Sequence, residues 1–250
     1  MRIVKLTQET TRNLLEELLE RSPNSYGEYE SRVNEMIETV RTRRDEAVFD
    51  YTKRFDGADI NEQNIRVTAE EIQDAYEKAD PDLLRVMRKS LANIRSFHEK
   101  QIRQSFFTSQ ENGILLGQKI TPLKTAGVYV PGGKAVYPSS VLMNIVPAKV
   151  AGVERIIMTT PPDKDGNICP STLVAAKEAG ADEIYKVGGA QAVAAMAFGT
   201  KCIPKVDKIV GPGNIYVALA KKAVFGYVSI DSIAGPSEIL VLADETADPV

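Results

Sequence analysis

Hydrophobic residues follow two different spacings along this chain, one in each half. In the first half they recur every three or four positions, which is the spacing of amphipathic helices. Thr68 with Glu71 makes a capping box, and Asp80 can cap a helix that has Pro81 in its first turn. We therefore expect helices over residues 10–21, 29–55, from 68 onward and 80–104.

The second half alternates short apolar runs with small-residue or amphipathic segments. An Asn112-Gly113 pair between residues 105–110 and 114–120 favours a β-ribbon. Beyond it the alternation is typical of a Rossmann-like parallel sheet with right-handed crossovers and helices on both faces. Strands are expected near 126–130, 155–160, 183–187, 206–210 and 238–243, and helices near 138–151, 171–179, 190–198 and 214–224.

Five Gly/Pro turns follow the apolar runs of the second half, at residues 130–133, 160–162, 187–191, 210–214 and 234–238. A single turn of this kind only separates a strand from a helix. Four of the five, however, carry a hydrogen-bonding or aromatic side chain, and these are Tyr129, Gln191, Asn214 and the pair Ser237 and Glu238. Because the carboxyl ends of parallel strands meet at one edge of a sheet, we expect these loops to line one ligand crevice.

Two of these side chains have an alternative role that the sequence leaves open. Gln191 lies near the amino end of a segment, residues 187–200, that has no charged residue and is expected to be packed on most of its circumference. It can face a ligand or satisfy a local backbone group. Asn214 follows Gly-Pro-Gly and is also a good helix cap.

Composition narrows the possible functions. The chain has 250 residues, 43% apolar content and a formal charge of -3, so nothing favours a nucleic-acid partner. The start becomes polar too soon for a secretory signal, and the longest apolar stretch, residues 141–153, is interrupted by polar residues, so we expect neither a signal nor a membrane segment. Two remote cysteines, Cys169 and Cys202, suit a reducing compartment. We expect a cytosolic protein.

Several long motifs, in order along nearly the whole chain, resemble the histidinol dehydrogenase family. They are Gly-Val-Tyr-Val-Pro-Gly-Gly at 127–133, Val-Gly-Gly-Ala-Gln-Ala at 187–192, Pro-Lys-Val-Asp-Lys-Ile-Val-Gly-Pro-Gly-Asn at 204–214 and Ala-Gly-Pro-Ser-Glu at 234–238. Shorter matches lie at Arg54-Phe55-Asp56-Gly57, Phe97-His98-Glu99 and Leu116-Gly117-Gln118. The chain has no dinucleotide-binding Gly-x-Gly-x-x-Gly motif.

The resemblance implies an NAD-dependent enzyme of histidine biosynthesis that oxidises L-histidinol through the aldehyde to L-histidine, with a bound zinc and a homodimeric assembly. Tyr129, Gln191 and Asn214 fall on the family's NAD-contacting positions, and Ser237 falls on a substrate-contacting one. The implied domains are an N-terminal helical arm (1–24), an incomplete, largely helical first domain (25–125, continued by 238–250) and a Rossmann-like cofactor domain (126–237).

The resemblance also implies that some of the chemistry is missing here. The family's zinc ligands and its catalytic Glu-His pair belong to motifs that do not occur in this sequence. The single histidine, His98, is expected to be structural, and one imidazole with two remote thiols cannot form a nitrogen-rich zinc site. We assign no catalytic residue, regard both thiols as inert, and expect the chain to be inactive alone.

Two other functions remain open. The chain can be a non-catalytic nucleotide-binding module that keeps the crevice without the chemistry. It can also be a self-association module, in which the apolar face of the first helix, formed by Leu14, Leu15, Leu18 and Leu19, is buried between copies.

Overall fold

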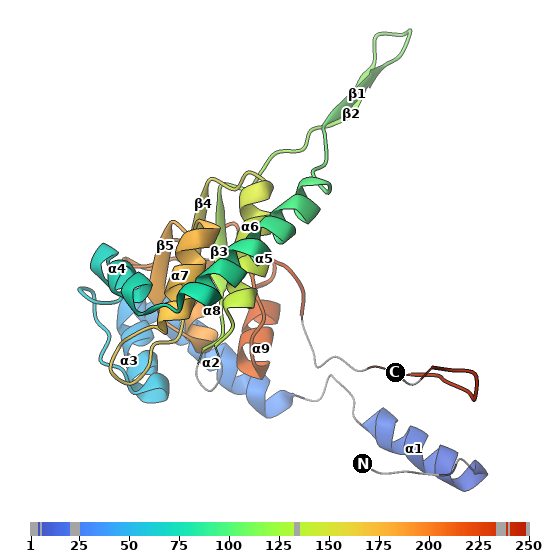
Figure 1. The fold of residues 1–250 in the computed structure, drawn as a ribbon, viewed down its shortest axis with the longest axis horizontal. Helices are drawn as coiled ribbons and strands as arrows, with labels where there is room; N and C mark the ends of the chain where they lie inside the picture. The colour runs from blue at the N-terminus through green and yellow to red at the C-terminus, as the bar shows by residue number, and fades with distance from the viewer. Residues whose placement is uncertain are drawn as a thin grey trace.

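A computed structural model describes residues 5, 7–20, 26–132, 136–233, 239 and 241–248. Its centre is a parallel sheet of five strands in the order β5-β4-β3-β6-β7, of which Figure 1 labels β3, β4 and β5. The fold is therefore α/β, as predicted. The strands are β3 (Thr125–Tyr129), β4 (Arg155–Thr160), β5 (Glu183–Lys186), β6 (Lys208–Val210) and β7 (Ser229–Ile230).

Both faces of the sheet are apolar, because the strands are covered on both sides. In β3, Ala126 and Val128 enter one hydrophobic core, whereas Tyr129 enters the other. In β4 the same alternation sends Ile156 to the first core and Ile157 to the second. Because both faces are covered, residues that point to either face of β3 and β4 are mostly buried.

Helices cover the sheet in two layers on each side. On one face lie α8 and α9, with α2 and α3 packed outside them, and on the other lie α6 and α7, with α4 and α5 outside. Helices of the first half thus complete both cores (Figure 1). Their bounds are α2 (Gly27–Arg43), α3 (Asp45–Asp56), α4 (Ala69–Lys78), α5 (Pro81–Glu99), α6 (Pro138–Val150), α7 (Pro170–Ala179), α8 (Gly189–Phe198) and α9 (Ile215–Val224).

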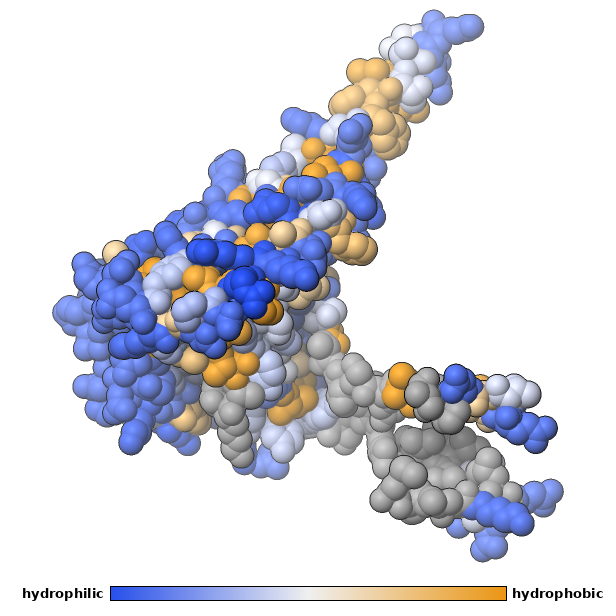
Figure 2. Space-filling view, in the orientation of Figure 1, coloured by the Kyte–Doolittle hydropathy of each residue, from blue (hydrophilic) through white to orange (hydrophobic). Residues whose placement is uncertain are grey.

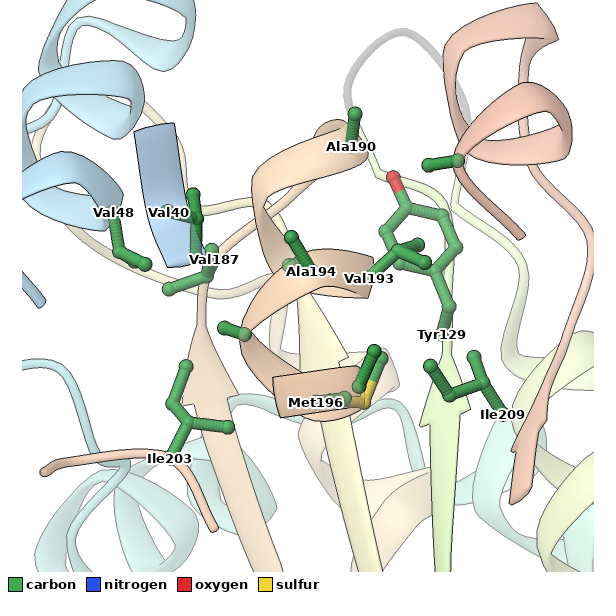
Figure 3. Packing of buried hydrophobic residues seen from close by; sticks show 14 of the residues in the cluster. Val40, Val48, Tyr129, Val187, Ala190, Val193, Ala194, Met196, Ile203 and Ile209 are labelled. Carbon is green, nitrogen blue, oxygen red and sulfur yellow. The ribbon is translucent and has the colours of Figure 1, made fainter. Parts of the chain in front are cut away.

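Helix α8 is the most deeply buried element. Every residue from 190 to 197 is buried, which confirms the prediction drawn from its lack of charged residues. Figure 3 shows it between the sheet and Val40 and Val48, which belong to α2 and α3. A helix that is apolar all round is stable in water only when it is enclosed in this way.

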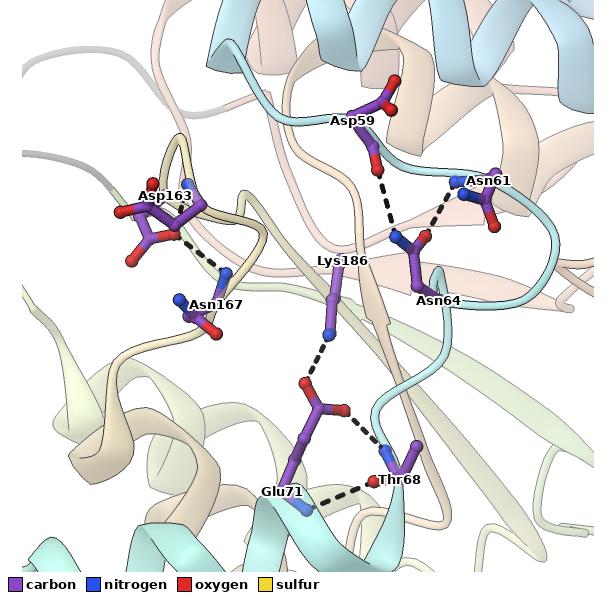
Figure 4. A network of polar contacts seen from close by, with 9 residues as sticks. Asp59, Asn61, Asn64, Thr68, Glu71, Asp163, Asn167 and Lys186 are labelled. Carbon is purple, nitrogen blue, oxygen red and sulfur yellow. Dashed lines mark hydrogen bonds and ion pairs between the residues drawn. The ribbon is translucent and has the colours of Figure 1, made fainter.

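The expected capping box of α4 is present and also connects this helix to the sheet. Thr68 accepts a hydrogen bond from the Glu71 amide, and the Glu71 carboxylate accepts one from the Thr68 amide. The same carboxylate forms an ion pair with Lys186 at the end of β5 (Figure 4). The cap at Asp80 is confirmed as well, although α5 ends at Glu99 and not near residue 104.

The helix expected over residues 29–55 is not continuous. The segment 29–55 forms two helices, because Arg44 has φ 54° and turns the chain between α2 and α3. A non-glycine residue in this conformation needs support from outside its own segment. The Arg44 guanidinium donates to the carbonyl of Gly199 at 2.8 Å, and the Asp45 carboxylate accepts from the amides of Lys201 and Cys202.

One expected strand is also wrong. Of the segment 238–243, residues 239 and 241–243 are described and do not form a strand. Ile239, Val241 and Leu242 are each at least 75% exposed, so no apolar face in the described part of the chain covers them. The edge position beside β6 is taken instead by β7, which pairs Ile230 with Ile209.

The predicted β-ribbon is confirmed as an antiparallel pair, β1 (Phe106–Ser109) and β2 (Leu115–Gln118), and it projects away from the body (Figure 1). All of its strand residues are exposed, including Phe106, Phe107 and Leu115. Figure 2 shows these apolar side chains as a band along the projection. A two-stranded ribbon with no covered face is marginally stable in isolation.

The N-terminal segment forms α1 (Gln8–Glu20), close to the predicted helix, but the side chains of its four leucines lie outside the described part. The domain boundaries at 24/25, 125/126 and 237/238 stay predictions. Across the described residues, none of the helices has the length and apolar content that crossing a membrane would need.

Candidate functional site at the sheet switch point

A cavity of about 730 Å³ lies at the carboxyl ends of the strands. It opens beside β3, where strand order reverses, since β4 and β5 continue to one side and β6 and β7 to the other. This reversal is where parallel α/β sheets bind ligands. The lining residues are Arg32, Glu35, Met36, Tyr51, Arg54, Phe55, Asp56, Tyr129, Gly132, Pro161, Gly189, Ala190, Gln191, Asn214 and Tyr216.

The cavity brings together three of the four predicted site residues. Tyr129 ends β3, Gln191 lies in the first turn of α8, and Asn214 caps α9. The fourth, Ser237, and the turn at 234–238 lie outside the described residues.

Tyr129 is 4% exposed, and its ring packs beside α8 with the hydroxyl near Ala190 (Figure 3). The hydroxyl oxygen accepts a hydrogen bond from the Gly189 amide at 3.2 Å. Burial, with a smaller contribution from the charge of Asp56, raises the pKa of Tyr129. The hydroxyl therefore keeps its proton at neutral pH and can donate it to a ligand.

Gln191 is 1% exposed, and its Oε1 has no hydrogen-bond partner within the described chain. The alternative in which this oxygen satisfies a local backbone group is therefore wrong. A buried amide oxygen without a partner costs about 1–3 kcal/mol. A side chain with such an oxygen on a cavity wall is suited to a ligand that brings a donor.

Asn214 caps α9, as the sequence allows, and it also lines the cavity. Its Oδ1 accepts a hydrogen bond from the Val217 amide at 3.2 Å, which caps α9. The cap fixes the side chain at the cavity wall and leaves the amide nitrogen as a donor.

The loops after β4 and β5 approach each other too closely for a side chain. A Cβ at Gly188 would lie 2.5 Å from Cβ of Pro161, so only glycine fits there. This close contact places Pro161 and Gly189 on the same wall of the cavity.

An ion pair between a buried lysine and an exposed aspartate holds the loop that carries Asn214. Lys221 is 2% exposed, donates to the Gly211 carbonyl at 2.9 Å and forms an ion pair with Asp231. Asp231 in turn accepts a hydrogen bond from the Gly211 amide at 2.8 Å. The ion pair thus binds both the amide and the carbonyl of Gly211, and this fixes the backbone that leads into Asn214.

The opposite wall comes from α2 and α3, which the sequence did not place at the site. These helices contribute Arg32 and Arg54, whose guanidinium groups suit phosphate oxygens, and an aromatic pair, Tyr51 and Phe55, whose rings stack 5.7 Å apart. The motif at 54–57 does not by itself predict a place at the site, because no local signal shows that α3 reaches the ends of the strands.

Asp56 is the most unusual group in the cavity. It is the last residue of α3, where the helix dipole is unfavourable to a negative charge, and its Oδ2 is buried without a partner in the described ranges. Burial raises the pKa of this carboxyl to about 6. At neutral pH the group is charged at a cost in stability.

Because the charged form of Asp56 destabilises the fold, the stability of the protein is expected to depend on pH. Because the folded pKa is raised, the folded state holds the proton between about pH 4 and 6, and stability falls as the pH rises through 6. We expect Asp56→Asn to raise the free energy of unfolding at pH 7.5 by about 1–2 kcal/mol, after allowance for partial solvent screening, and to change it little at pH 4. Urea titrations at both values check this. A variant less stable than the parent at pH 7.5 would contradict it.

The remaining candidate groups lie away from the cavity. Cys202 follows α8 at the amino ends of the strands, and burial raises the pKa of its thiol to about 12. Cys169 is exposed, 3.4 Å from the Ser171 hydroxyl, and His98 Nδ1 lies 2.7 Å from Gln101 Oε1. Within the described ranges no three His, Cys, Asp or Glu side chains lie close enough to hold a metal ion.

Comparison with known proteins gives one consistent family. The histidinol dehydrogenase family model matches residues 19–250. Histidinol dehydrogenase from Heliobacterium mobile is 63% identical over 217 residues, covering 87% of this chain and 51% of that protein, and the one from Listeria innocua is 57% identical over 241 residues, covering 96% and 56%.

A solved structure agrees with these relatives. The crystal structure of histidinol dehydrogenase from Elizabethkingia anophelis superimposes with a TM-score of 0.82 at 41% identity, covering 88% of this chain and 50% of that one. The chain spans about half the length of the relatives it matches.

Proposed function

The chain belongs to the histidinol dehydrogenase family, and on that premise we propose that its cavity binds NAD for the oxidation of L-histidinol to L-histidine via the aldehyde. The observation that carries the proposal is the meeting of Tyr129, Gln191 and Asn214 in one cavity at the switch point of the sheet. These are the residues that the family resemblance assigns to the cofactor.

The cavity suits a dinucleotide in size and chemistry. Its volume, about 730 Å³, is in the range of cofactor pockets, and its walls combine aromatic rings with a few polar groups. The arginines at positions 32 and 54 can neutralise a pyrophosphate. The partnerless oxygens of Gln191 and Asp56 match the hydroxyl and amide donors of a nucleotide.

Each of the three residues has a distinct part in binding. Tyr129 presents a fixed ring face and a proton to donate, Gln191 an acceptor, and Asn214 a donor held by its capping bond. When bound, NAD supplies the hydride acceptor of the reaction. The protein's own contribution here is to orient the cofactor at the edge where the strands end.

Gln191 offers the sharpest test of this proposal. We expect Gln191→Leu to weaken NAD binding, measured by isothermal titration calorimetry, by at least tenfold, about 1.4 kcal/mol, because an acceptor is lost from the site. The same variant is expected to keep or slightly raise the free energy of unfolding, since it removes a buried oxygen that lacks a partner.

The matched control is Gln73→Leu, which makes the same chemical change at an exposed position of α4 outside the cavity. NAD affinity is expected to stay within twofold of the parent there. Equal affinity in both variants would contradict the proposed site, and so would the absence of NAD binding by the parent chain.

The rest of the reaction is proposed by family membership. Ser237 is the candidate contact for L-histidinol, and the family's zinc is assigned no ligand here because the described residues offer no metal-binding group. We derive no step through zinc. We propose that the protein acts in the cytoplasm as a homodimer, and the exposed apolar side chains of β1 and β2 suit burial against another surface.

We propose that this 250-residue chain alone does not oxidise histidinol. NADH formation, followed at 340 nm with saturating NAD and L-histidinol, is expected to remain at the level of a no-enzyme control. Turnover that co-purifies with the chain and is lost in Gln191→Leu would contradict this expectation. NAD binding without turnover would fit the non-catalytic nucleotide-binding alternative for the isolated chain.

A further inference from the structure

Asp56 occupies a position that costs the fold stability and has no structural explanation. Its carboxylate ends α3, where carbonyl groups already concentrate negative charge, and Oδ2 has no hydrogen-bond partner within the part of the chain that the structure describes. The residue is partly buried, and it lines the same cavity as Tyr129 and Gln191.

Nearby positive charge does not account for the carboxylate. Both arginines that line the cavity are exposed and contact groups other than Asp56, since Arg32 pairs with Glu28 at the surface and the Arg54 guanidinium lies 5.4 Å from the centre of the Phe55 ring. In the described ranges neither forms an ion pair with Asp56. A donor that enters the cavity with a ligand would supply the partner that the described part of the chain does not.

The chemistry of the cavity identifies the donor. A carboxylate has two acceptor oxygens, and the terminal torsion of aspartate is broad, so a ligand that reaches the group can engage both of them. Two adjacent hydroxyls on a sugar match such a pair. Aromatic walls beside the carboxylate suit the base that such a sugar carries, and the arginines suit its phosphates.

We propose that Asp56 binds the vicinal hydroxyls of the adenosine ribose and thereby selects NAD over NADP. This inference rests on the proposed NAD site. A 2′-phosphate would replace one of the two donors with a dianion placed against a carboxylate in a partly desolvated cavity, which is strongly repulsive. Glutamine at position 191, which is uncharged, cannot discriminate in this way.

The experiment measures the dissociation constants of NAD and NADP for the 250-residue chain by isothermal titration calorimetry at pH 7.5. For the parent we expect NADP to bind at least roughly tenfold more weakly than NAD. In Asp56→Asn we expect this ratio to fall by on the order of tenfold, with weaker NAD binding and stronger NADP binding. A thermal melt of the variant checks that it is folded, and its midpoint is expected to rise.

Glu35→Gln is the matched control. Glu35 lines the same cavity and carries the same charge, but it is exposed, so its removal tests the overall field of the cavity. We expect the NAD to NADP ratio to stay at the parent value in this variant. An equal loss of discrimination in both variants, or an unchanged ratio in Asp56→Asn, would overturn the assignment while leaving the NAD site in place.

Three further outcomes are decisive. A parent chain that binds NADP as tightly as NAD would also overturn the role of Asp56. If Asp56→Asn keeps NAD affinity and discrimination but loses affinity for L-histidinol, the carboxylate binds the substrate ammonium group and the ribose assignment is wrong. A parent chain that binds neither dinucleotide would instead refute the proposed function itself.

Discussion

Replacing Gly211 with alanine is expected to destabilise the fold by about 3–5 kcal/mol, because two costs combine at this position. Its φ is 119°, which L-residues rarely adopt, and a Cβ would lie far inside the contact distance of the Tyr129 carbonyl oxygen. The clash is with backbone, so no side-chain rotation relieves it. Urea unfolding followed by circular dichroism measures the loss.

A substitution at Gly226 separates the cost of the backbone conformation from the cost of the steric clash. Its φ is 103°, similar to that of Gly211, but a Cβ there would meet no described heavy atom within 4 Å. Gly226→Ala is therefore expected to cost about 1–2 kcal/mol, from backbone strain alone. Equal losses in the two variants would show that Gly211 is not in close contact with the end of β3.

The second large effect is expected at the ion pair beside the same loop. Lys221→Met leaves the Asp231 carboxylate without its cation and the Gly211 carbonyl without its donor. We expect a loss of about 1–3 kcal/mol, because the Gly211 carbonyl is left without its donor and the Asp231 carboxylate, whose side chain stays 32% exposed, loses its cation. We also expect weaker NAD binding under conditions where the variant is folded, since the ion pair positions the loop that ends at Asn214.

Lys222→Met is the control for this prediction. Lys222 is the neighbouring residue and also forms an ion pair, with Glu30, but both side chains are substantially exposed. Its loss is expected to cost at most about 1 kcal/mol. The double variant Lys221→Met with Asp231→Asn is expected to recover part of the loss, because no unpaired charge remains. A double variant that shows the full sum of both single losses would contradict the coupling.

Local signals in the sequence were sufficient to find one wall of the cavity. Each turn after a strand contains glycine or proline, and parallel topology then dictates that these turns meet at one edge. For this reason the sequence alone predicts that Tyr129, Gln191 and Asn214 lie together. The capping box at Thr68 and the uncharged helix α8 could be predicted for the same reason, since each depends on neighbouring residues.

Long-range contacts account for what the sequence did not reveal. The break at Arg44 contains neither glycine nor proline. The Arg44 guanidinium is held by a hydrogen bond that it donates to a carbonyl 155 positions away. The role of Lys221 depends on Asp231 and Gly211, which lie on other elements. Asp56 reaches the cavity through the packing of α2 and α3 on α8, which no periodicity encodes.

The wrong strand at 238–243 has a related cause. Alternation or apolarity predicts a strand only where a partner strand and a covering layer exist. In the described part of the chain the position beside β6 is already occupied by β7, and the apolar side chains of residues 239, 241 and 242 stay exposed.

The most direct test of the central claim is a crystal structure of the chain grown with NAD. We expect the dinucleotide in the cavity between Tyr129, Gln191 and Asn214, with the adenosine ribose against Asp56. Cofactor bound instead in the neighbouring cavity of about 400 Å³, beside Cys169 and Asp74, or on another face of the molecule, would contradict the claim.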